Sequence, residues 1–220
     1  MLEMSMSRLI QHFAFVIFLL SPTWSHSEAE YKPTELKLDK ASSHQISGHQ
    51  YTRIAPIADA QRRYKEILEK LQEKHYKRLE INDALSQLYL NAYIESLDPQ
   101  KSYFLESDIV EFNKWRNLLD DFLLDGEVSP GYAMYNRFLL RAEDQLLKNL
   151  TLLKSDFEFD LNGNEKLIID AEKRTWIKSP DDAMNFWERR IKDSLIRLIL
   201  NDKDPIAARE LIIKRYENQL

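Results

Sequence analysis

From residue 57 to the end of the chain, apolar residues recur at intervals of three and four. This spacing places them along one face of an α-helix, because a helix turns once every 3.6 residues. Glycine occurs only four times in 220 residues, although tight hairpins, phosphate-binding loops and nucleophile elbows depend on it. The sequence therefore predicts a mainly α fold, and it disfavours most nucleotide sites and serine-hydrolase scaffolds.

Capping signals divide this region into successive helices. The first apolar stripe consists of Ala60, Tyr64, Ile67, Leu68, Leu71, His75 and Leu79. Asn82 is a good N-cap for a second helix, which Pro99 should end because proline disfavours helical geometry in the residue before it. The side chains that this helix should bury are Leu85, Leu88, Tyr89, Ala92 and Leu97.

The third helix should begin at a Ser107 cap and run from Asp108 to about Leu124, where Asp125-Gly126 closes it. Its predicted buried residues are Ile109, Phe112, Trp115, Leu118, Leu119 and Phe122. Later helices begin where proline fits the first turn, at Ser129-Pro130, Ser179-Pro180 and Asp204-Pro205. The last of them is still amphipathic where the chain ends, so we expect that helix to be incomplete.

One segment breaks the helical spacing. FEFDLNGNEKLIID has Asn162-Gly163 at its centre, which predicts a small β-hairpin near residues 157–170. DLNGNE within it resembles part of a calcium loop, but neither register supplies the glutamate required at position 12, so a hairpin turn is the better interpretation. The expected architecture is an antiparallel multi-helix domain over residues 57–220 with this hairpin.

The N-terminus predicts export. Arg8 precedes an apolar run over residues 13–20 and then small and polar residues, which is typical of a signal peptide over residues 1–27. Eight apolar residues are too few to span a bilayer, which takes about 20; a buried apolar segment is the alternative. Residues 28–56 are polar and should form a flexible or irregular leader.

Little in the chain predicts chemistry. The net charge of −5 disfavours nucleic acid as a partner, and cysteine is absent. No histidine follows His75, so a Ser-His-Asp arrangement has little to draw on, although a Ser-Lys dyad stays open. His44 and His49 fit solvated loop residues better than a metal pair. We expect no catalytic residue, no cofactor and no metal site.

The stretch YIESLDPQKSYFLESDIVEF, residues 93–112, raises a separate question. Its flanks predict helices, and the turn between them carries Tyr103, Phe104 and Leu105, where a surface turn would be polar. One interpretation is a loop that plugs the ends of two antiparallel helices. The other is a docking knob for another domain.

This stretch resembles one near the start of the tail-specific proteases, or C-terminal processing peptidases, in which L-D-P-x-x-S-Y-F-L-x-x-D-I follows the first helices of the N-terminal domain. The matching residues are Leu97, Asp98, Pro99, Ser102, Tyr103, Phe104, Leu105, Asp108 and Ile109. HYKRLEIND upstream and YNRFLLRAEDQL, FEFD, WERRIKDSLIRLIL and IIKRYENQL downstream follow the family's order. The resemblance covers about residues 57–220.

The resemblance implies a periplasmic serine endopeptidase in which a PDZ domain and a protease domain, with a serine nucleophile and a lysine base, follow this region. Neither catalytic motif is present in the chain, so no catalytic residue is carried over and we expect the chain to be inactive alone. The implied role is a non-catalytic helical domain that helps form the body receiving a polypeptide substrate. Its partners would be the PDZ and protease domains and an adaptor protein. The alternative is a stand-alone periplasmic helical protein that binds a protein partner.

Overall fold

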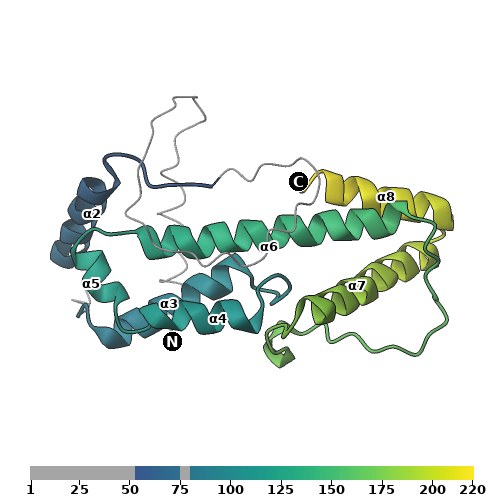
Figure 1. Ribbon diagram of the computed structural model, residues 1–220, viewed down its shortest axis with the longest axis horizontal. Helices are drawn as coiled ribbons and strands as arrows, with labels where there is room; N and C mark the ends of the chain where they lie inside the picture. Colours follow the sequence, from purple (N-terminus) through teal and green to yellow (C-terminus); the bar gives the residue numbers. More distant parts are fainter. Residues whose placement is uncertain (1–52, 75–79) are drawn as a thin grey trace. The chain divides into compact units, whose positions relative to one another are not determined.

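The computed structural model describes residues 53–74 and 80–220. The predicted signal peptide, most of the predicted leader, His44, His49, His75 and Leu79 lie outside this part. Contacts divide the chain into Met1–Arg53 and Ile54–Leu220, and the account below concerns the second unit. Its elements are α2 (Ala60–Lys74), α3 (Asp83–Leu97), α4 (Glu106–Phe112), the 3-10 turn η1 (Asn113–Trp115), α5 (Leu119–Leu124), α6 (Ser129–Lys154), the 3-10 turn η2 (Ala171–Lys173), α7 (Pro180–Leu200) and α8 (Pro205–Glu217) (Figure 1).

Several helix boundaries form as the capping signals predict. The Asn82 side chain accepts a hydrogen bond from the Leu85 N–H at the start of α3, and Ser179 accepts one from the Asp182 N–H at the start of α7. Asp204 accepts from the N–H groups of the first turn of α8. These caps satisfy donors that have no partner inside the helix. The mainly α prediction is confirmed.

Gly126 follows α5 in the left-handed region, with φ of +68°. An added Cβ would lie 2.7 Å from the Gln61 carbonyl oxygen, so glycine is required both by the backbone and by the approach of α2. Gln61 in turn donates from Nε2 to the Asp125 carbonyl at 2.9 Å. The predicted end of the third helix at Asp125-Gly126 is therefore confirmed.

The prediction of one helix from Asp108 to Leu124 is wrong in detail. The segment is divided into α4, η1 and α5, and Ser107 does not cap it. Because the helical path is interrupted, Leu118 turns outward and is 44% exposed, whereas Phe112, Trp115 and Leu119 enter the core. The start of α6 is also shifted by one residue, since Val128 rather than Ser129 occupies the cap position.

The buried face of α3 also differs from the prediction. Ser86, Leu90 and Ile94 are buried, while Leu88 is 43% exposed. The helix carries apolar residues on several sides, so their spacing does not select one face. Ser86 further obscures the pattern, because it is a polar residue whose hydroxyl donates to the buried Asp120 carboxylate at 2.6 Å.

The small β-hairpin predicted near residues 157–170 is not found, and no strand occurs in residues 53–74 or 80–220. The Asp160 carboxylate accepts from the Asn162 N–H, so the turn is closed locally. The flanks are held by helices instead of by each other: Phe159 and Leu161 pack on the cluster between α6, α7 and α8, and Glu165 pairs with Lys192. A single parallel bridge joins Leu105 to Ile177.

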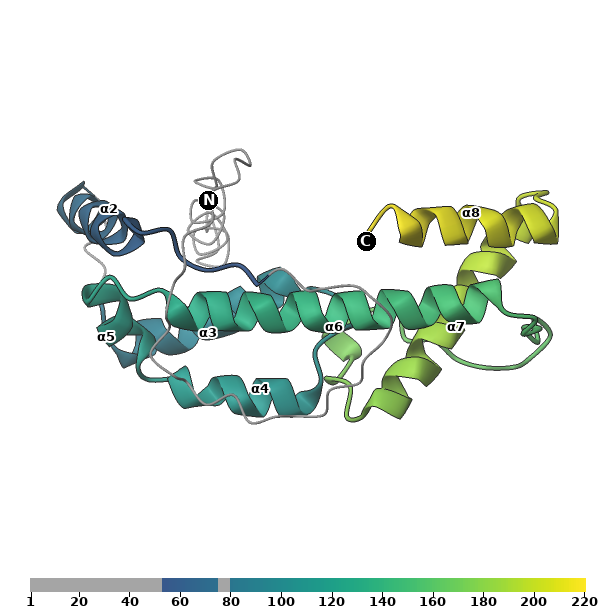
Figure 2. The ribbon, with the colours of Figure 1, turned by 45° about the horizontal axis from the view of Figure 1, so that its top comes forward.

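Helix α6 belongs to two hydrophobic cores. The first core joins it to α3 and α4 around Leu90, Ile94, Phe104, Phe112, Trp115, Leu119 and Met134. The second joins its C-terminal half to α7 and α8 around Leu153, Ile191, Leu195, Ala208 and Ile212. Figure 2 shows α6 passing beside α3 and α4 and continuing to α7 and α8. Within the described ranges, no helix has the length and apolar character needed to cross a membrane.

Candidate functional site

The turn between α3 and α4, residues 98–105, is organised by the Asp98 carboxylate. Oδ1 accepts from the Ser102 N–H at 2.9 Å, and Oδ2 accepts from the N–H groups of Tyr103 at 2.8 Å and Phe104 at 3.0 Å. The Asp98 carbonyl also accepts from the Lys101 N–H, and Lys101 has a φ of +45°. A single buried side chain thus supplies acceptors for three N–H groups that no helix or strand satisfies.

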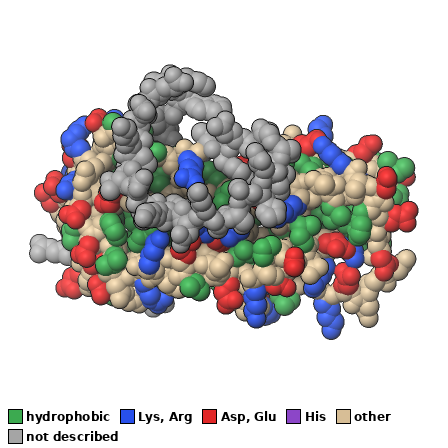
Figure 3. Space-filling view, in the orientation of Figure 1, with side chains coloured by type: hydrophobic (Ala, Val, Ile, Leu, Met, Phe, Trp, Pro, Cys, Tyr) green, Lys and Arg blue, Asp and Glu red, His purple; other side chains and the backbone are tan. Residues whose placement is uncertain are grey.

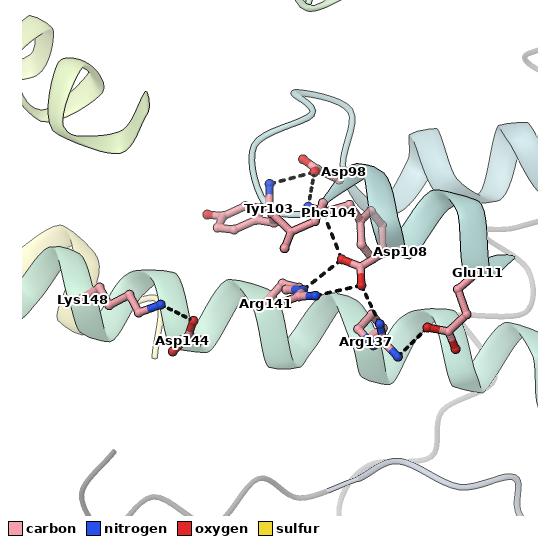
Figure 4. Close-up of polar contacts among 10 residues, drawn as sticks. Asp98, Tyr103, Phe104, Asp108, Glu111, Arg137, Arg141, Asp144 and Lys148 are labelled. Carbon is pink, nitrogen blue, oxygen red and sulfur yellow. Dashed lines mark hydrogen bonds and ion pairs between the residues drawn. The ribbon is translucent and has the colours of Figure 1, made fainter. Parts of the chain in front are cut away.

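A second buried carboxylate, Asp108, lies in the first turn of α4. Its Oδ2 reaches back and accepts from the N–H of the cap residue Leu105 at 2.9 Å, so Asp108, and not the predicted Ser107, holds the start of the helix. Arg141 approaches Asp108 with two bonds, Nε to Oδ2 and Nη2 to Oδ1, both 2.9 Å long. Arg137 donates from Nη1 to Oδ1 (Figure 4). Asp108 is fully buried, so these contacts replace its hydration.

The electrostatics of this cluster favour the ionised carboxylate. Burial by itself would raise the pKa of Asp108, but the bonds from Arg141, the Leu105 N–H and Arg137 outweigh it and lower that pKa below its usual value. Burial would likewise lower the pKa of Arg137, yet Asp108 and Glu111 raise it. Arg137 also donates from Nη2 to Glu111 at 2.8 Å. Two arginines on neighbouring turns of α6, Arg137 and Arg141, therefore bond to α4.

The aromatic side chains of the turn pack inside the domain. Phe104 is fully buried, with ring centroids 5.4 Å from Phe112 and 5.9 Å from Phe138. Tyr103 meets the edge of Phe138 at 5.6 Å and lies 5.2 Å from Trp187 of α7. Burial raises the pKa of Tyr103. Of the two interpretations of this turn, the packing therefore agrees with a plug and not with a projecting knob.

Ser102 connects the turn to α7. Its carbonyl accepts from the Trp187 Nε1–H at 2.9 Å, and its Oγ accepts from Arg190 Nη1 at 2.9 Å. The Glu106 N–H donates to the Ile177 carbonyl at 2.7 Å, beside the Leu105–Ile177 bridge. The turn is thus a junction at which α3, α4, α6 and the approach to α7 meet.

The structure brings most of the predicted motif residues together at this junction. The members that are buried are Asp98, Ser102, Phe104, Leu105 and Asp108. Leu97 and Ile109 pack partly buried against the first core, and Pro99 is exposed. Sequence reasoning missed Arg137 and Arg141 as partners of the motif. Their signal was available, since two arginines four residues apart flank Phe138 on the same helix face.

The chemistry of the junction is structural. Both oxygens of Asp98 are bonded to backbone donors, and both oxygens of Asp108 are bonded to backbone or guanidinium donors. Among the residues with described positions, no three His, Cys, Asp or Glu side chains form a group that could hold a metal ion. What the arrangement can do is fix an apolar turn rigidly between helices.

Comparison with known proteins shows that the junction lies in a part of the chain whose sequence is similar to that of a known family. Residues 67–220 match a family described as the tail specific protease N-terminal domain, so the matched range includes all of the turn and its arginine partners. A protein named tail-specific protease from Haemophilus influenzae is 33% identical over 148 residues. The alignment covers 67% of this chain and 21% of that protein, so the chain spans about a fifth of the length of the relative it matches.

Proposed function

The chain belongs to the tail-specific protease N-terminal domain family, and on that premise we propose that it serves as the non-catalytic helical domain of a periplasmic tail-specific serine protease. In this proposal it packs with the PDZ and protease domains of the same enzyme and helps form the body that receives a polypeptide substrate. The proposal includes an adaptor protein as a further partner. The match over residues 67–220 is the observation that carries the proposal.

The geometry supports a scaffold role for this region. The two buried aspartates of the motif are bonded to backbone N–H groups and arginines, so they stabilise a fixed arrangement of helices. A catalytic carboxylate would need an accessible lone pair or proton directed at substrate. Because neither the serine nor the lysine motif of the resembled family occurs in the chain, we expect residues 57–220, expressed alone, to have no peptidase activity.

The mass of the native protein tests the proposal. An antibody raised against residues 57–220 should detect, in a periplasmic fraction, a protein much larger than 26.1 kDa whose tryptic peptides include PDZ and protease sequences. A cytoplasmic marker protein controls for leakage between fractions. Finding the protein only in the cytoplasm would contradict the proposed location.

The same blot decides the second candidate, a stand-alone periplasmic helical protein that binds a partner. A periplasmic band slightly below 26.1 kDa, with the signal peptide removed, would contradict the protease-domain proposal and favour this alternative. A crosslinked species that contains the band and one other protein would then identify the partner.

A further inference from the structure

Three cationic side chains lie at the turn at residues 98–105: Lys101 belongs to the turn, and Arg174 and Arg190 bond to side chains in it. Lys101 Nζ donates to the Arg174 carbonyl at 3.0 Å, and Arg174 Nη2 donates to Gln100 Oε1 at 2.8 Å. Arg190 Nη1 donates to Ser102 Oγ at 2.9 Å. All three acceptors are neutral, and within residues 53–74 and 80–220 none of these cations has an acidic partner at ion-pair distance.

The nearby carboxylates are already occupied. Asp98 directs its oxygens at the backbone N–H groups of the turn, and Asp170 pairs with Lys173 at 3.3 Å. Burial, followed by the positive charge of Arg190, lowers the pKa of Arg174 despite the opposing influence of Asp98 and Asp170. The charge of Arg190 thus acts against that of Arg174, whereas Arg137 and Arg141 share the Asp108 carboxylate.

Arg174 also carries a hydrogen-bond donor without a partner. Its Nε is buried and has no hydrogen-bond partner, although a buried guanidinium N–H is costly to leave unsatisfied. Aromatic rings hold the arginines in place: the Phe186 centroid lies 5.2 Å from Arg174 Cζ and 5.7 Å from Arg190 Cζ. Arg190 also lies 4.8 Å from the Trp187 centroid. Guanidinium groups fixed beside rings are well suited to bind oxyanions.

We propose that Lys101, Arg174 and Arg190 form an oxyanion site that binds the carboxylates of an acidic polypeptide segment. The cations come from three separate stretches of chain, the turn, the segment after η2 and α7, so they present charge to more than one carboxylate. The partly exposed Phe186 and Trp176 rings lie beside them and match the methylene groups of glutamate side chains. The site goes beyond the proposed protease role, because such binding is measurable whether or not the chain is part of a protease.

The test uses the full chain and a fluorescein-labelled hexaglutamate peptide, with binding followed by fluorescence anisotropy at about 0.05 M and about 0.15 M salt. We expect saturable binding that Arg174→Gln weakens at least tenfold. The affinity of Arg174→Lys should lie between those of the wild type and Arg174→Gln, because lysine keeps the charge and lacks the planar guanidinium group. The matched control is Arg197→Gln on the exposed side of α7, which removes the same charge from a surface pair with Asp193 and should change affinity less than twofold.

Lys101→Gln is a second variant. It was chosen because Lys101 Nζ donates to the Arg174 carbonyl, so the substitution leaves the bonds of the Arg174 and Arg190 side chains in place. Its affinity should fall several-fold, with an unchanged far-ultraviolet circular dichroism spectrum. Equal losses in Arg174→Gln and Arg197→Gln, or equal binding of a hexaglutamine peptide, would overturn the site. Inorganic phosphate that displaces the peptide at a lower concentration than acetate and free glutamate would overturn the polypeptide assignment and show a site for a free oxyanion.

Discussion

Two irregular connections in this domain have opposite characters. The turn at residues 98–105 contains Phe104 and Leu105 in its interior, whereas the connection at residues 155–178 leaves Phe157, Ile168 and Ile169 exposed. Both contain apolar residues between helices. The difference lies in the backbone: Asp98 and Asp108 together accept from four N–H groups of the first connection, whereas in the second Asp160 and Asp170 each accept from one N–H two residues further on.

Apolar side chains in an irregular segment can therefore be buried only when the peptide groups that accompany them find partners. An unsatisfied buried N–H costs about 1–3 kcal/mol, comparable with the gain from burying one large apolar side chain. The buried aspartates of the motif remove that cost. The following predictions test this explanation by damaging each connection in matched ways.

Asp108→Ala should have the largest effect. It leaves Arg137, Arg141 and the Leu105 N–H without their buried acceptor, and losing one partner of a buried ion pair typically costs about 3–5 kcal/mol. Urea unfolding followed by circular dichroism measures the change. Asp144→Ala is the control, because Asp144 and Lys148 form a partly exposed pair within α6 (Figure 4). We expect this substitution to cost less than about 0.5 kcal/mol. Similar losses in both variants would contradict the role of Asp108.

Asp98→Ala should be the next most damaging change. Three N–H groups of the turn lose their acceptor, for which we expect about 2–4 kcal/mol of destabilisation after partial rehydration. Asp160→Ala makes the same change in the exposed connection, where water replaces the lost bond, and should cost less than about 0.5 kcal/mol. Hydrogen exchange of the Tyr103 and Phe104 amides should accelerate in Asp98→Ala alone. Unchanged exchange there would show that other groups hold the turn.

Gly126→Ala and Gly163→Ala extend the comparison to glycine. At Gly126 the positive φ and the close Gln61 carbonyl should make alanine unfavourable by about 1–2 kcal/mol. At Gly163 the nearest atom to an added Cβ is 3.5 Å away, so alanine should change stability by less than about 0.5 kcal/mol. Thermal unfolding of the two variants side by side measures the difference. Gly126 lies in the turn after α5, so a more damaging change at Gly163 would show that the connection at residues 155–178 is more constrained than that turn.

The smallest expected effect is a dependence of stability on pH. Because the pKa of folded Asp108 lies below its unfolded value near 3.9, its contribution is fully present above about pH 4 and is lost as the pH falls through the folded pKa. The urea midpoint of the wild type should therefore fall more steeply from pH 5 to pH 2 than that of Asp108→Asn. Asp144→Asn should follow the wild type. Parallel curves for wild type and Asp108→Asn would contradict the assignment.

The sequence predicts what short-range interactions decide. The caps at Asn82, Ser179 and Asp204 could be predicted from the sequence, because each side chain bonds to an N–H no more than three residues away. The nine motif residues were identified by resemblance, and the burial of Asp98 and Asp108 was not foreseen. The arginine partners of Asp108 come from farther away: Arg141 lies 33 residues from Asp108 along the chain, and spacing alone does not pair them.

The predictions that failed have a common cause. The Asn162-Gly163 signal for a hairpin is local, but Phe159 and Leu161 before it pack on α6, α7 and α8, and that tertiary packing overrides the tendency to pair. In α3 the spacing left several faces equally apolar, so only the packing of α3 on α5 and α6 selected Leu90 and Ile94. Local signals therefore located most helix ends, and contacts between helices determined which residues are buried.

The bond from the Trp187 indole to the Ser102 carbonyl has a consequence for the order of events during synthesis. Asp98 bonds to residues within six positions of itself, so the bonds within the turn need no later part of the chain, but Trp187 lies 85 residues beyond Ser102. At a synthesis rate of roughly 5–20 residues per second, Trp187 of α7 is made about 4 to 17 seconds after Tyr103. Until Trp187 is made, the Tyr103 ring lacks one of the two aromatic neighbours that it has in the folded domain, the other being Phe138.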